Sequence, residues 1–350
     1  MASYLLRRLL LMIPTLFGIM AITFLVIQFV PGGPVERTLS IMQQQMQAGG
    51  EVSGGGGLGY RGAKGLDPAQ IDQLKRLYGF DRPAHERFVT MMWNFLRFDF
   101  GESYYQHRSV TDLVISKLPV SISLGVWTFL LTYLVSIPLG IRKAVHHGTP
   151  FDTFTSVLIL VGYSIPGFVL GILLVVLFGG GSFWNLFPLR GLVSDHWATL
   201  PWTGRILDYF WHLVLPLTAS TVGSFAVTTM LTKNCFLEEI SKQYVLTARA
   251  KGLDDRAVLF RHVFRNAMMP LVTGFPGSFV AAFFSGSLLI ETIFSLDGLG
   301  LLGYESVMHR DYPVVMATLY FFSLLGLITR LLTDLTYVLV DPRITFDSRS

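Results

Sequence analysis

The chain has 350 residues, of which 51% are hydrophobic and 14% charged, whereas an ordinary soluble domain carries about 25% charged residues. So few charges could not cover so much apolar surface in water. This composition argues against a soluble globular protein, a disordered tail and a nucleic-acid-binding protein. The net charge of +4 requires no polyanionic partner, and the single cysteine, Cys235, excludes an intrachain disulfide and a Cys-based zinc site.

Apolar intervals with few or no charges mark the candidate membrane crossings. A helical crossing takes roughly 20 apolar residues, and in lipid only a helix satisfies every backbone group internally. Six intervals are long enough: residues 9–30, 118–141, 153–189, 209–232, 266–290 and 312–340. The first apolar run is longer than the core of about 7–15 residues in a secretory signal, so we expect it to be retained. The sequence predicts an all-α membrane protein with six transmembrane helices.

The intervals divide the chain into four predicted parts. These are a first transmembrane helix (1–30), an external loop (31–117), a five-helix transmembrane core (118–340) with a long connection at 233–270, and a tail (341–350). The external loop holds a Gly-rich tract at 49–65, which we expect to be mobile. We also expect a short helix starting at Asp67-Pro68 and an amphipathic one around Phe88–Phe95.

Basic residues favour one orientation. With the N-terminus inside, the inner side holds thirteen Lys and Arg residues and the short outer loops hold three. Short loops rich in Lys and Arg stay in the cytoplasm. Both termini and the connection 233–270 are therefore predicted to be cytoplasmic, as expected for a multi-pass protein of a cell's inner membrane.

Signatures of catalysis and cofactor binding are missing from the sequence. It contains no Gly-Lys pair, hence no Walker A phosphate loop, and no His-Glu-x-x-His zinc motif. A G-x-G-x-x-G pattern at 57–62 falls in a glycine tract with no strand before it. His146 and His147 are read as part of a solvated loop. We expect no catalytic residue, metal or cofactor in this chain.

Other residues inside the spans point to helix packing. Arg330 and Asp334 lie one helical turn apart, so we expect them to form an intramembrane ion pair. Pro138, Pro166 and Pro276 interrupt the second, third and fifth spans. Two small-residue faces, at 167–171 and 282–286, offer close helix contacts.

The connection 233–270 predicts more structure than a simple turn requires. Residues 238–251 have the pattern of a short helix that Gly252 ends. Asp254 is a candidate cap for a second helix over 255–268.

This connection resembles the coupling loop of bacterial ABC importer permeases of the dipeptide/oligopeptide/nickel subclass. The matching stretches are YVLTARAKGL at 244–253 and RHVFRNAMMP at 261–270. The general permease motif places Glu-Ala-Ala before the glycine, and here Leu246, Thr247 and Ala248 take those positions. Its proline also comes later than in the general motif, at Pro270.

Further stretches resemble the same subclass along nearly the whole chain. They are PGGP at 31–34, LYGFDRP at 77–83, DFGES at 99–103, RDYPVV at 310–315 and DPR at 341–343. An unusual insert at 41–66, which contains MQQQM, resembles the Yej-type permeases associated with peptide and microcin C import.

The resemblance implies a type I ABC importer permease fold and a set of partners. These are a second homologous permease subunit, cytoplasmic ATPase subunits that bind ATP and magnesium, a periplasmic peptide-binding protein and membrane lipid. The chain would form half of a peptide translocation pathway without being an enzyme. An importer of nickel or another small solute is the alternative within the subclass. An intramembrane protease would need a catalytic dyad, and an ion-driven transporter would need more buried acidic residues than the spans hold.

The resemblance also implies that the loop docks on an ATPase subunit. The residues expected to carry this coupling are Thr247, Ala248, Arg249, Ala250, Lys251, Gly252 and Leu253. We expect the small Ala248 and Ala250 to permit close approach of the partner. Arg249 and Lys251 are expected to pair with acidic groups on it, through charge-assisted bonds.

Overall fold

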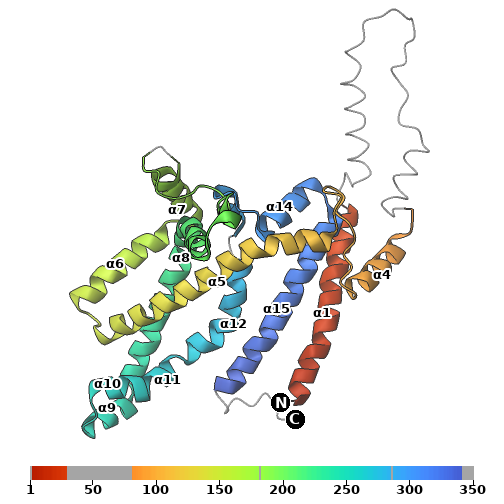
Figure 1. Ribbon diagram of the computed structural model, residues 1–350. Helices are drawn as coiled ribbons and strands as arrows, with labels where there is room; N and C mark the ends of the chain where they lie inside the picture. Colours follow the sequence, from red (N-terminus) through yellow and green to blue (C-terminus); the bar gives the residue numbers. More distant parts are fainter. Residues whose placement is uncertain (1, 30–80, 181–182, 285–286, 341–350) are drawn as a thin grey trace, which may run out of the picture. The chain divides into compact units, whose positions relative to one another are not determined.

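The computed structural model describes residues 2–29, 81–180, 183–284 and 287–340 (Figure 1). Within these ranges every regular element is a helix, and the strand-like contact is an isolated bridge between Glu102 and Ser109. The predicted all-helical class is therefore confirmed for the described part of the chain. The tract at 49–65, the helix predicted from Asp67 and the tail at 341–350 lie outside the described residues.

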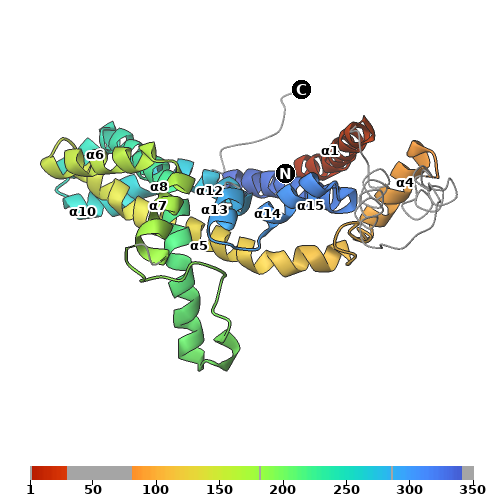
Figure 2. The same ribbon diagram turned by 90° about the horizontal axis from the view of Figure 1, so that it is seen from above.

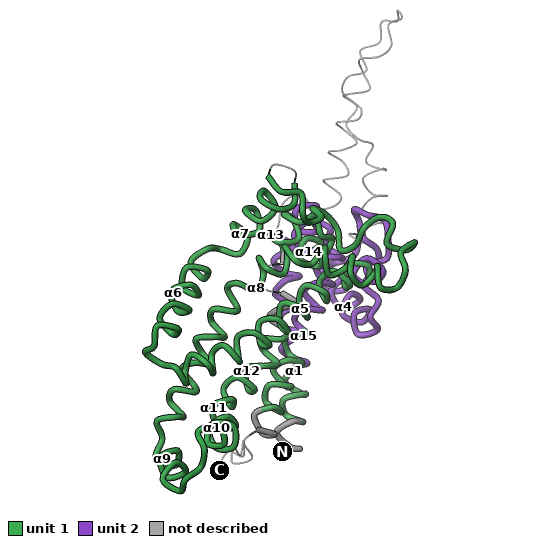
Figure 3. Tube along the Cα trace, turned by 60° about the vertical axis from the view of Figure 1, so that its left-hand side comes forward, with its two compact units in different colours: residues 1–12, 116–302, 324–350 green, residues 13–115, 303–323 purple. Residues whose placement is uncertain are grey.

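The chain divides into two compact units (Figure 3). Unit 1 comprises residues 1–12, 116–302 and 324–350, and unit 2 comprises residues 13–115 and 303–323. Four helices have residues in both units: α1 (Ala2–Phe29), α5 (Val110–Val145), α14 (Leu299–His309) and α15 (Tyr312–Val340). The predicted division at residues 30, 117 and 340 followed membrane crossings rather than packing, and it stays a prediction.

Unit 2 has an aromatic core beside a short helix, α4 (Ala84–Phe95). Pro83 precedes the helix, and its carbonyl accepts from the amides of Glu86 and Arg87. The ring of Phe95 packs 4.8 Å from that of Phe100 and 5.5 Å from that of Tyr320. The amphipathic helix predicted around Phe88–Phe95 is thus confirmed, and its last residue belongs to the core.

Unit 1 holds the remaining elements. They are α6 (Pro150–Ser164), α7 (Gly167–Leu174), a short π-helix η2 (Val175–Gly179), a 3-10 helix η3 (Trp197–Thr199), α8 (Trp202–Ile240), α12 (Met269–Phe284) and α13 (Ser287–Ile293). The smaller elements of residues 243–267 are described below. Figure 2 shows the first turns of α8 and the loop before them, in green, extending away from α6 and α7. The rest of α8 forms the centre against which α6 and α7 pack.

Pro166 breaks the third predicted span, as its sequence position indicated. The chain bends by 89° between α6 and the α7–η2 segment. Proline has no amide proton and disfavours helix in the residue before it, and Ile165 is indeed extended. Directly after the break, a Cβ on Gly167 would lie 2.7 Å from the carbonyl oxygen of Ala219. The small-residue face at 167–171 therefore makes the predicted close contact, with α8.

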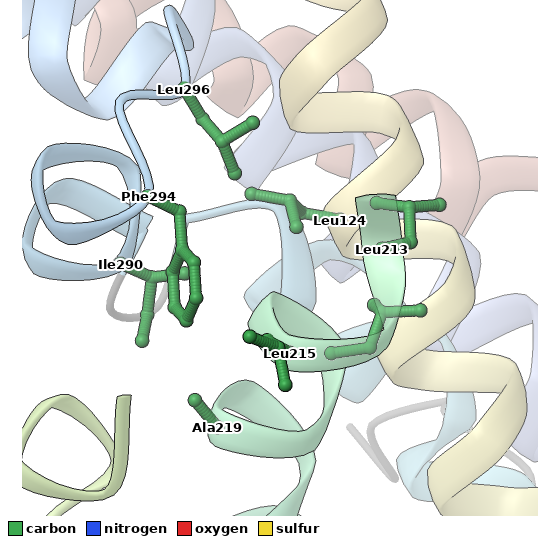
Figure 4. Close-up of a cluster of buried hydrophobic side chains, with 8 residues drawn as sticks. Leu124, Leu213, Leu215, Ala219, Ile290, Phe294 and Leu296 are labelled. Atoms are coloured by element: carbon green, nitrogen blue, oxygen red, sulfur yellow. The ribbon is translucent and has the colours of Figure 1, made fainter. Parts of the chain in front are cut away.

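A cluster of buried apolar side chains joins α5, α8 and α13 (Figure 4). Its fully or nearly fully buried members are Leu124, Leu213, Leu215, Leu217, Ala219, Ile290, Phe294 and Leu296. At the edge of the cluster, the indole of Trp127 donates to the Tyr209 hydroxyl at 3.0 Å. A Trp–Tyr pair buries a large apolar area while satisfying its polar atoms.

Four described helices are long and apolar enough to cross a membrane: α1 from Leu6, α5, α8, and α15 as far as Thr336. The bent pair of α6 with α7–η2 makes up to five. The predicted fifth span, 266–290, corresponds in part to α12, which has 16 residues and is followed by two undescribed ones. Because a crossing takes roughly 20 residues, the six crossings stay a prediction.

Candidate functional site: the helical lobe between α8 and α12

Four short helices follow the end of α8, in the connection that the sequence singled out. They are α9 (Gln243–Ala250), α10 (Asp255–Val258), the short π-helix η4 (Leu259–Val263) and α11 (Phe264–Ala267). Together with the last turn of α8 they form residues 236–268, here called the helical lobe (Figure 1). The helix predicted at 238–251 is two helices, because α8 ends at Ile240 and α9 begins at Gln243.

The turn between α9 and α10 has the predicted signals. Gly252 adopts φ +80°, a left-handed conformation that strains residues with a Cβ. Its amide donates to the Arg249 carbonyl at 2.9 Å, and the Leu253 amide reaches the Ala248 carbonyl at 3.4 Å. The Asp254 side chain then accepts from the Arg256 amide at 3.2 Å and caps α10. The predicted helix stop and cap are both confirmed.

An apolar core of its own holds the helical lobe together. Its buried members are Ala144, Phe236, Val245, Ala248, Val258, Val263 and Ala267. The first of these residues comes from the end of α5 and the second from α8. The lobe is thus packed against two long helices rather than suspended as a solvated loop.

A polar network at the start of α9 adds to this packing. The Tyr244 hydroxyl donates to Glu239 Oε1 at 2.6 Å and accepts from Asn266 Nδ2 at 3.3 Å. Burial, with the hydrogen bond to Glu239, raises the pKa of Tyr244 above its ordinary value. Lys242 pairs with the other oxygen of Glu239. These contacts join α8, α9 and α11, and no motif in the sequence had indicated them.

The seven residues expected to carry coupling do not share one environment. Thr247, Arg249, Ala250, Lys251, Gly252 and Leu253 are exposed, whereas Ala248 is 5% exposed. The expected role of Ala248 as a point of close approach for a partner is therefore wrong. Its small side chain is needed because it packs inside the core of the lobe.

Arg249 already has a partner within the chain. Its Nε lies 3.0 Å from Asp255 Oδ1, and the two side chains are 47% and 81% exposed. Exposed ion pairs contribute about 0–1 kcal/mol, so such a pair exchanges readily for an acidic group on another protein. The expected intermolecular pairing of Arg249 stays a prediction.

Exposed apolar side chains accompany these polar residues, and the sequence reasoning had not singled them out. Leu246 and Phe260 are more than half exposed. Leu246 and Ala250 are four residues apart in α9 and so lie on the same face of the helix. A hollow of about 370 Å³ lies beside this helix and is lined by Ala144, Val145, Ile240, Val245, Arg249, Asp255, Arg256, Val258, Leu259 and Val263. The exposed surface of the lobe is therefore apolar and basic, and it lies over the buried apolar core of the lobe.

Behind the lobe lies a buried cluster of charges that sequence reasoning missed. Lys143, on α5, and Lys233, on α8, both pair with Asp152 near the start of α6. A signal was present in the sequence, because each of these residues lies within two positions of an end of one of the charge-free intervals 118–141, 153–189 and 209–232. Three charges at the predicted inner ends of three consecutive spans are candidates for contact. The neighbouring His147 also lies 3.2 Å from Asp152 rather than in a purely solvated loop.

The predicted pair of Arg330 and Asp334 is not the one that forms in the described part of the chain. Arg8 Nε lies 3.1 Å from Asp334 Oδ2, and Arg330 is exposed. Spacing along one helix showed that Arg330 could reach Asp334, but it could not show that α1 brings a second arginine to the same carboxylate.

In unit 2, two stretches on which the family resemblance rested come into contact. The buried carboxylate of Asp311 accepts from the Ser103 hydroxyl and, at 3.0 Å, from the Tyr104 amide. Close by, the rings of Tyr105 and His309 stack at 3.9 Å. Residues 99–103 and 310–315 thus form one joint, although about 200 residues separate them.

Comparison with known proteins finds similar sequences along the whole chain. The sequence model of the family described as "Binding-protein-dependent transport system inner membrane component" matches residues 136–346. Over 362 residues the chain is 58% identical to the peptidoglycan transport system permease protein YejB of Agrobacterium fabrum. Over 366 residues it is 51% identical to the inner membrane ABC transporter permease protein YejB of Escherichia coli O157:H7. Both alignments cover the whole of each chain.

More distant relatives are also permeases. The chain is 33% identical over 360 residues to the dipeptide transport system permease protein DppB of Escherichia coli K12, with 98% of this chain and 99% of the relative covered. The family match begins in α5 and includes the whole helical lobe, while the full-length alignments extend the similarity to α1 and α4.

Proposed function

The chain belongs to the family of binding-protein-dependent transport system inner membrane components, and on this premise we propose that it is the permease subunit of an ATP-driven importer for peptides. The resemblance predicted from residues 244–270 is confirmed by the family match over 136–346. Permeases of this kind are not themselves enzymes. ATP and magnesium would be bound by partner subunits, in line with the missing phosphate loop.

The observation that carries this proposal is the surface of the helical lobe. Val245 and Ala248 fasten α9 to α5 and α8 through the buried core, while Leu246 and Ala250 face outward. A helix held in this way transmits a push to the long helices instead of yielding to it. Its exposed apolar and basic residues suit a cleft with acidic groups on an ATPase subunit.

The membrane topology is part of the same proposal. Six crossings would be α1, α5, α6 with α7–η2, α8, α12 with α13, and α15. The basic residues of the lobe and of the α5–α6 turn support a cytoplasmic position for both, and hence for both termini. The region 31–117 would then face the periplasm, where a binding protein delivers the substrate.

The substrate class follows from the relatives. Two of them are named for peptidoglycan and dipeptide transport, and a third, 32% identical, is the oligopeptide transport system permease protein AppB of Bacillus subtilis. Peptides, including those of the microcin C type and peptide-bearing cell-wall fragments, are the proposed cargo. A second homologous permease would form the other half of the pathway.

Uptake by vesicles tests this function. The chain would be produced together with its second permease, ATPase and binding-protein partners, purified and reconstituted with ATP inside the vesicles. We expect ATP-dependent entry of a labelled oligopeptide and no entry of radioactive nickel beyond empty vesicles. Nickel uptake without peptide uptake would assign the alternative substrate. The chain purified alone should show no ATPase activity, and activity without partners would contradict the permease role.

A further inference from the structure

One buried carboxylate binds three long helices together in unit 1. Lys233 Nζ, from α8, lies 2.8 Å from both carboxylate oxygens of Asp152. Lys143 Nζ, from α5, lies 3.0 Å from Asp152 Oδ1. In the turn between α5 and α6, the amide of Gly148 donates to Asp152 Oδ2 at 3.2 Å, the same distance as that of His147 Nδ1.

The three charged side chains are buried, and the donors of Lys143 have acceptors within the chain. The side chains of Lys143, Asp152 and Lys233 are 0%, 6% and 9% exposed. Lys143 also donates to the Asp152 carbonyl at 2.9 Å and to the hydroxyls of Thr155 and Ser156 at 2.7 and 2.8 Å. No donor of Lys143 is left over for a ligand, so the cluster is a joint between helices rather than a binding site.

This joint continues directly into the core of the helical lobe. Ala144 follows Lys143 in the chain, and Phe236 lies one turn after Lys233 on α8; both are buried members of that core. The backbones also approach closely there, since a Cβ on Gly140 would lie 2.8 Å from the Thr229 carbonyl oxygen. The end of α5, α8 and the lobe are therefore one packed body.

One face of α6 packs on α8, as part of this body. Most of α6 is outward-facing: Phe154, Val157, Leu158, Leu160 and Val161 are each more than half exposed. Its break at Pro166 leads into α7, which packs on α8 and α13. Near its first turn, the Asp152 carboxylate pairs with both α5 and α8, while Thr155 and Ser156 bond α6 to Lys143 of α5 alone.

From this geometry we infer that Asp152 is a positioning residue for transport, which makes α6 follow α8 and the helical lobe when the lobe is moved. The inference rests on the proposed function and adds to it the route by which motion reaches the third crossing. Apolar substitutes for a buried ion pair are often neutral or stabilising, so stability alone does not require such a cluster. Fixing one helix register is the better-attested use of buried ionic groups.

Separating this role from folding takes a pair of variants. Asp152→Asn leaves two buried ammonium groups without their carboxylate, and we expect less protein in the membrane. Asp152→Asn combined with Lys233→Gln returns the buried net charge to its original value but does not restore the ion pair between α6 and α8. Lys233→Arg keeps a cation that can bind both carboxylate oxygens. Asp208→Asn, near the other end of α8, is the matched control.

Uptake per ATP hydrolysed, measured in the reconstituted complex, is the first readout. We expect the double variant to insert normally and to hydrolyse ATP, with peptide uptake per ATP reduced about tenfold. Lys233→Arg and Asp208→Asn should retain coupling. Normal uptake per ATP in the double variant would overturn the inference. Absence of ATP-driven uptake by the wild-type complex would instead contradict the proposed function.

A distance measurement is the second readout. Spin labels at Phe154 on α6 and Ser241 on the lobe, both exposed, would be placed in a Cys235→Ser background. In the wild-type complex their separation should be the same with and without ATP, since α6 follows the lobe. In the double variant it should change or broaden on ATP binding. An invariant separation in the double variant would show that packing alone couples α6, and the role of Asp152 would be rejected.

Discussion

Ala248 and Ala250 lie two residues apart on α9, and the structure gives them opposite environments. Ala248 is 5% exposed and packs with Val245 and Phe236, whereas Ala250 is exposed. Two residues correspond to roughly 200° around a helix, so one side chain points into the lobe when the other points out. In the sequence, both are simply small residues shortly before Gly252. Because only Ala250 is exposed, substitutions at the two positions should affect different properties: docking of the lobe at Ala250 and folding of the lobe at Ala248.

Ala250→Trp tests docking of the lobe on the ATPase subunit. The exposed position accommodates the ring in the isolated subunit, so we expect normal membrane levels. In the complex the added ring would hold a partner surface away from Leu246 and its neighbours. Peptide uptake should fall about tenfold or more, and the ATPase should detach or hydrolyse ATP uncoupled from transport. Normal uptake at normal expression would contradict the docking role of this face.

Ala248→Trp is the matched folding variant. Inserting extra atoms into a well-packed core typically costs about 1–3 kcal/mol, and Ala248 is not among the residues that line the hollow beside α9. We expect a lower melting temperature of the purified subunit and reduced membrane levels, before any partner is present. If the variant were as stable as the wild type, Ala248 would have to be accessible, in conflict with its burial.

Gly252 carries a prediction about backbone conformation. At φ +80° a β-branched residue is strained, whereas Asn tolerates left-handed conformations better. Gly252→Val should destabilise the turn between α9 and α10 by about 1–2 kcal/mol, and Gly252→Asn by less. Hydrogen exchange of the Leu253 and Arg256 amides reports on this turn. Equal exchange in the two variants would show that the turn does not depend on φ.

Local signals in the sequence predicted the local structure of the lobe. The stop at Gly252 and the cap at Asp254 involve residues at most a few positions apart, so their geometry follows from the order of residues alone. The same holds for the break at Pro166. The six membrane crossings stay a prediction, because the residues after α12, 285–286, lie outside the described part of the fifth predicted span.

Local sequence signals could not predict contacts between segments that lie far apart in the chain. Asp334 pairs with Arg8, more than 300 residues away, rather than with Arg330 four residues away. Local spacing indicates which side chains of one helix can reach each other, but it gives no information about partners on another helix. The cluster around Asp152 was missed for the same reason, although its three charges stand at the ends of consecutive apolar intervals.

The pairing of Arg8 with Asp334 predicts unequal effects for the two arginines. Arg8→Gln removes a partner of a carboxylate that is 15% exposed, and should lower the stability of the subunit by about 0.6–1.7 kcal/mol. Arg330→Gln should change it by less than Arg8→Gln does, because Asp334 pairs with Arg8 in the described part of the chain. Thermal unfolding in detergent measures both. A larger effect of Arg330→Gln would restore the pairing first expected from sequence.

The joint at Asp311 gives a prediction for unit 2. Its carboxylate accepts from the Ser103 hydroxyl and from the amides of Tyr104, at 3.0 Å, and Tyr105, at 3.4 Å. In Asp311→Asn one carboxylate oxygen becomes an NH₂ group. This group cannot accept a hydrogen bond, and its N–H groups point toward the Ser103 hydroxyl and the two backbone amides, which are donors themselves. Hydrogen bonds to charged groups contribute about 1.5–3 kcal/mol, so the segment at 102–109 should open more often. Trypsin cleavage after the exposed Arg108 measures this opening.

We expect Asp311→Asn to accelerate cleavage at Arg108 about tenfold or more, because local opening limits access of the protease to the backbone. Asp112→Asn, an exposed aspartate four residues beyond the cleavage site, is the matched control and should cleave at the wild-type rate. Asp311→Glu would show whether charge alone suffices, since its longer side chain displaces the carboxylate from the three donors. Equal cleavage of the wild type and Asp311→Asn would mean that the stacked rings of Tyr105 and His309, rather than Asp311, hold this segment in place.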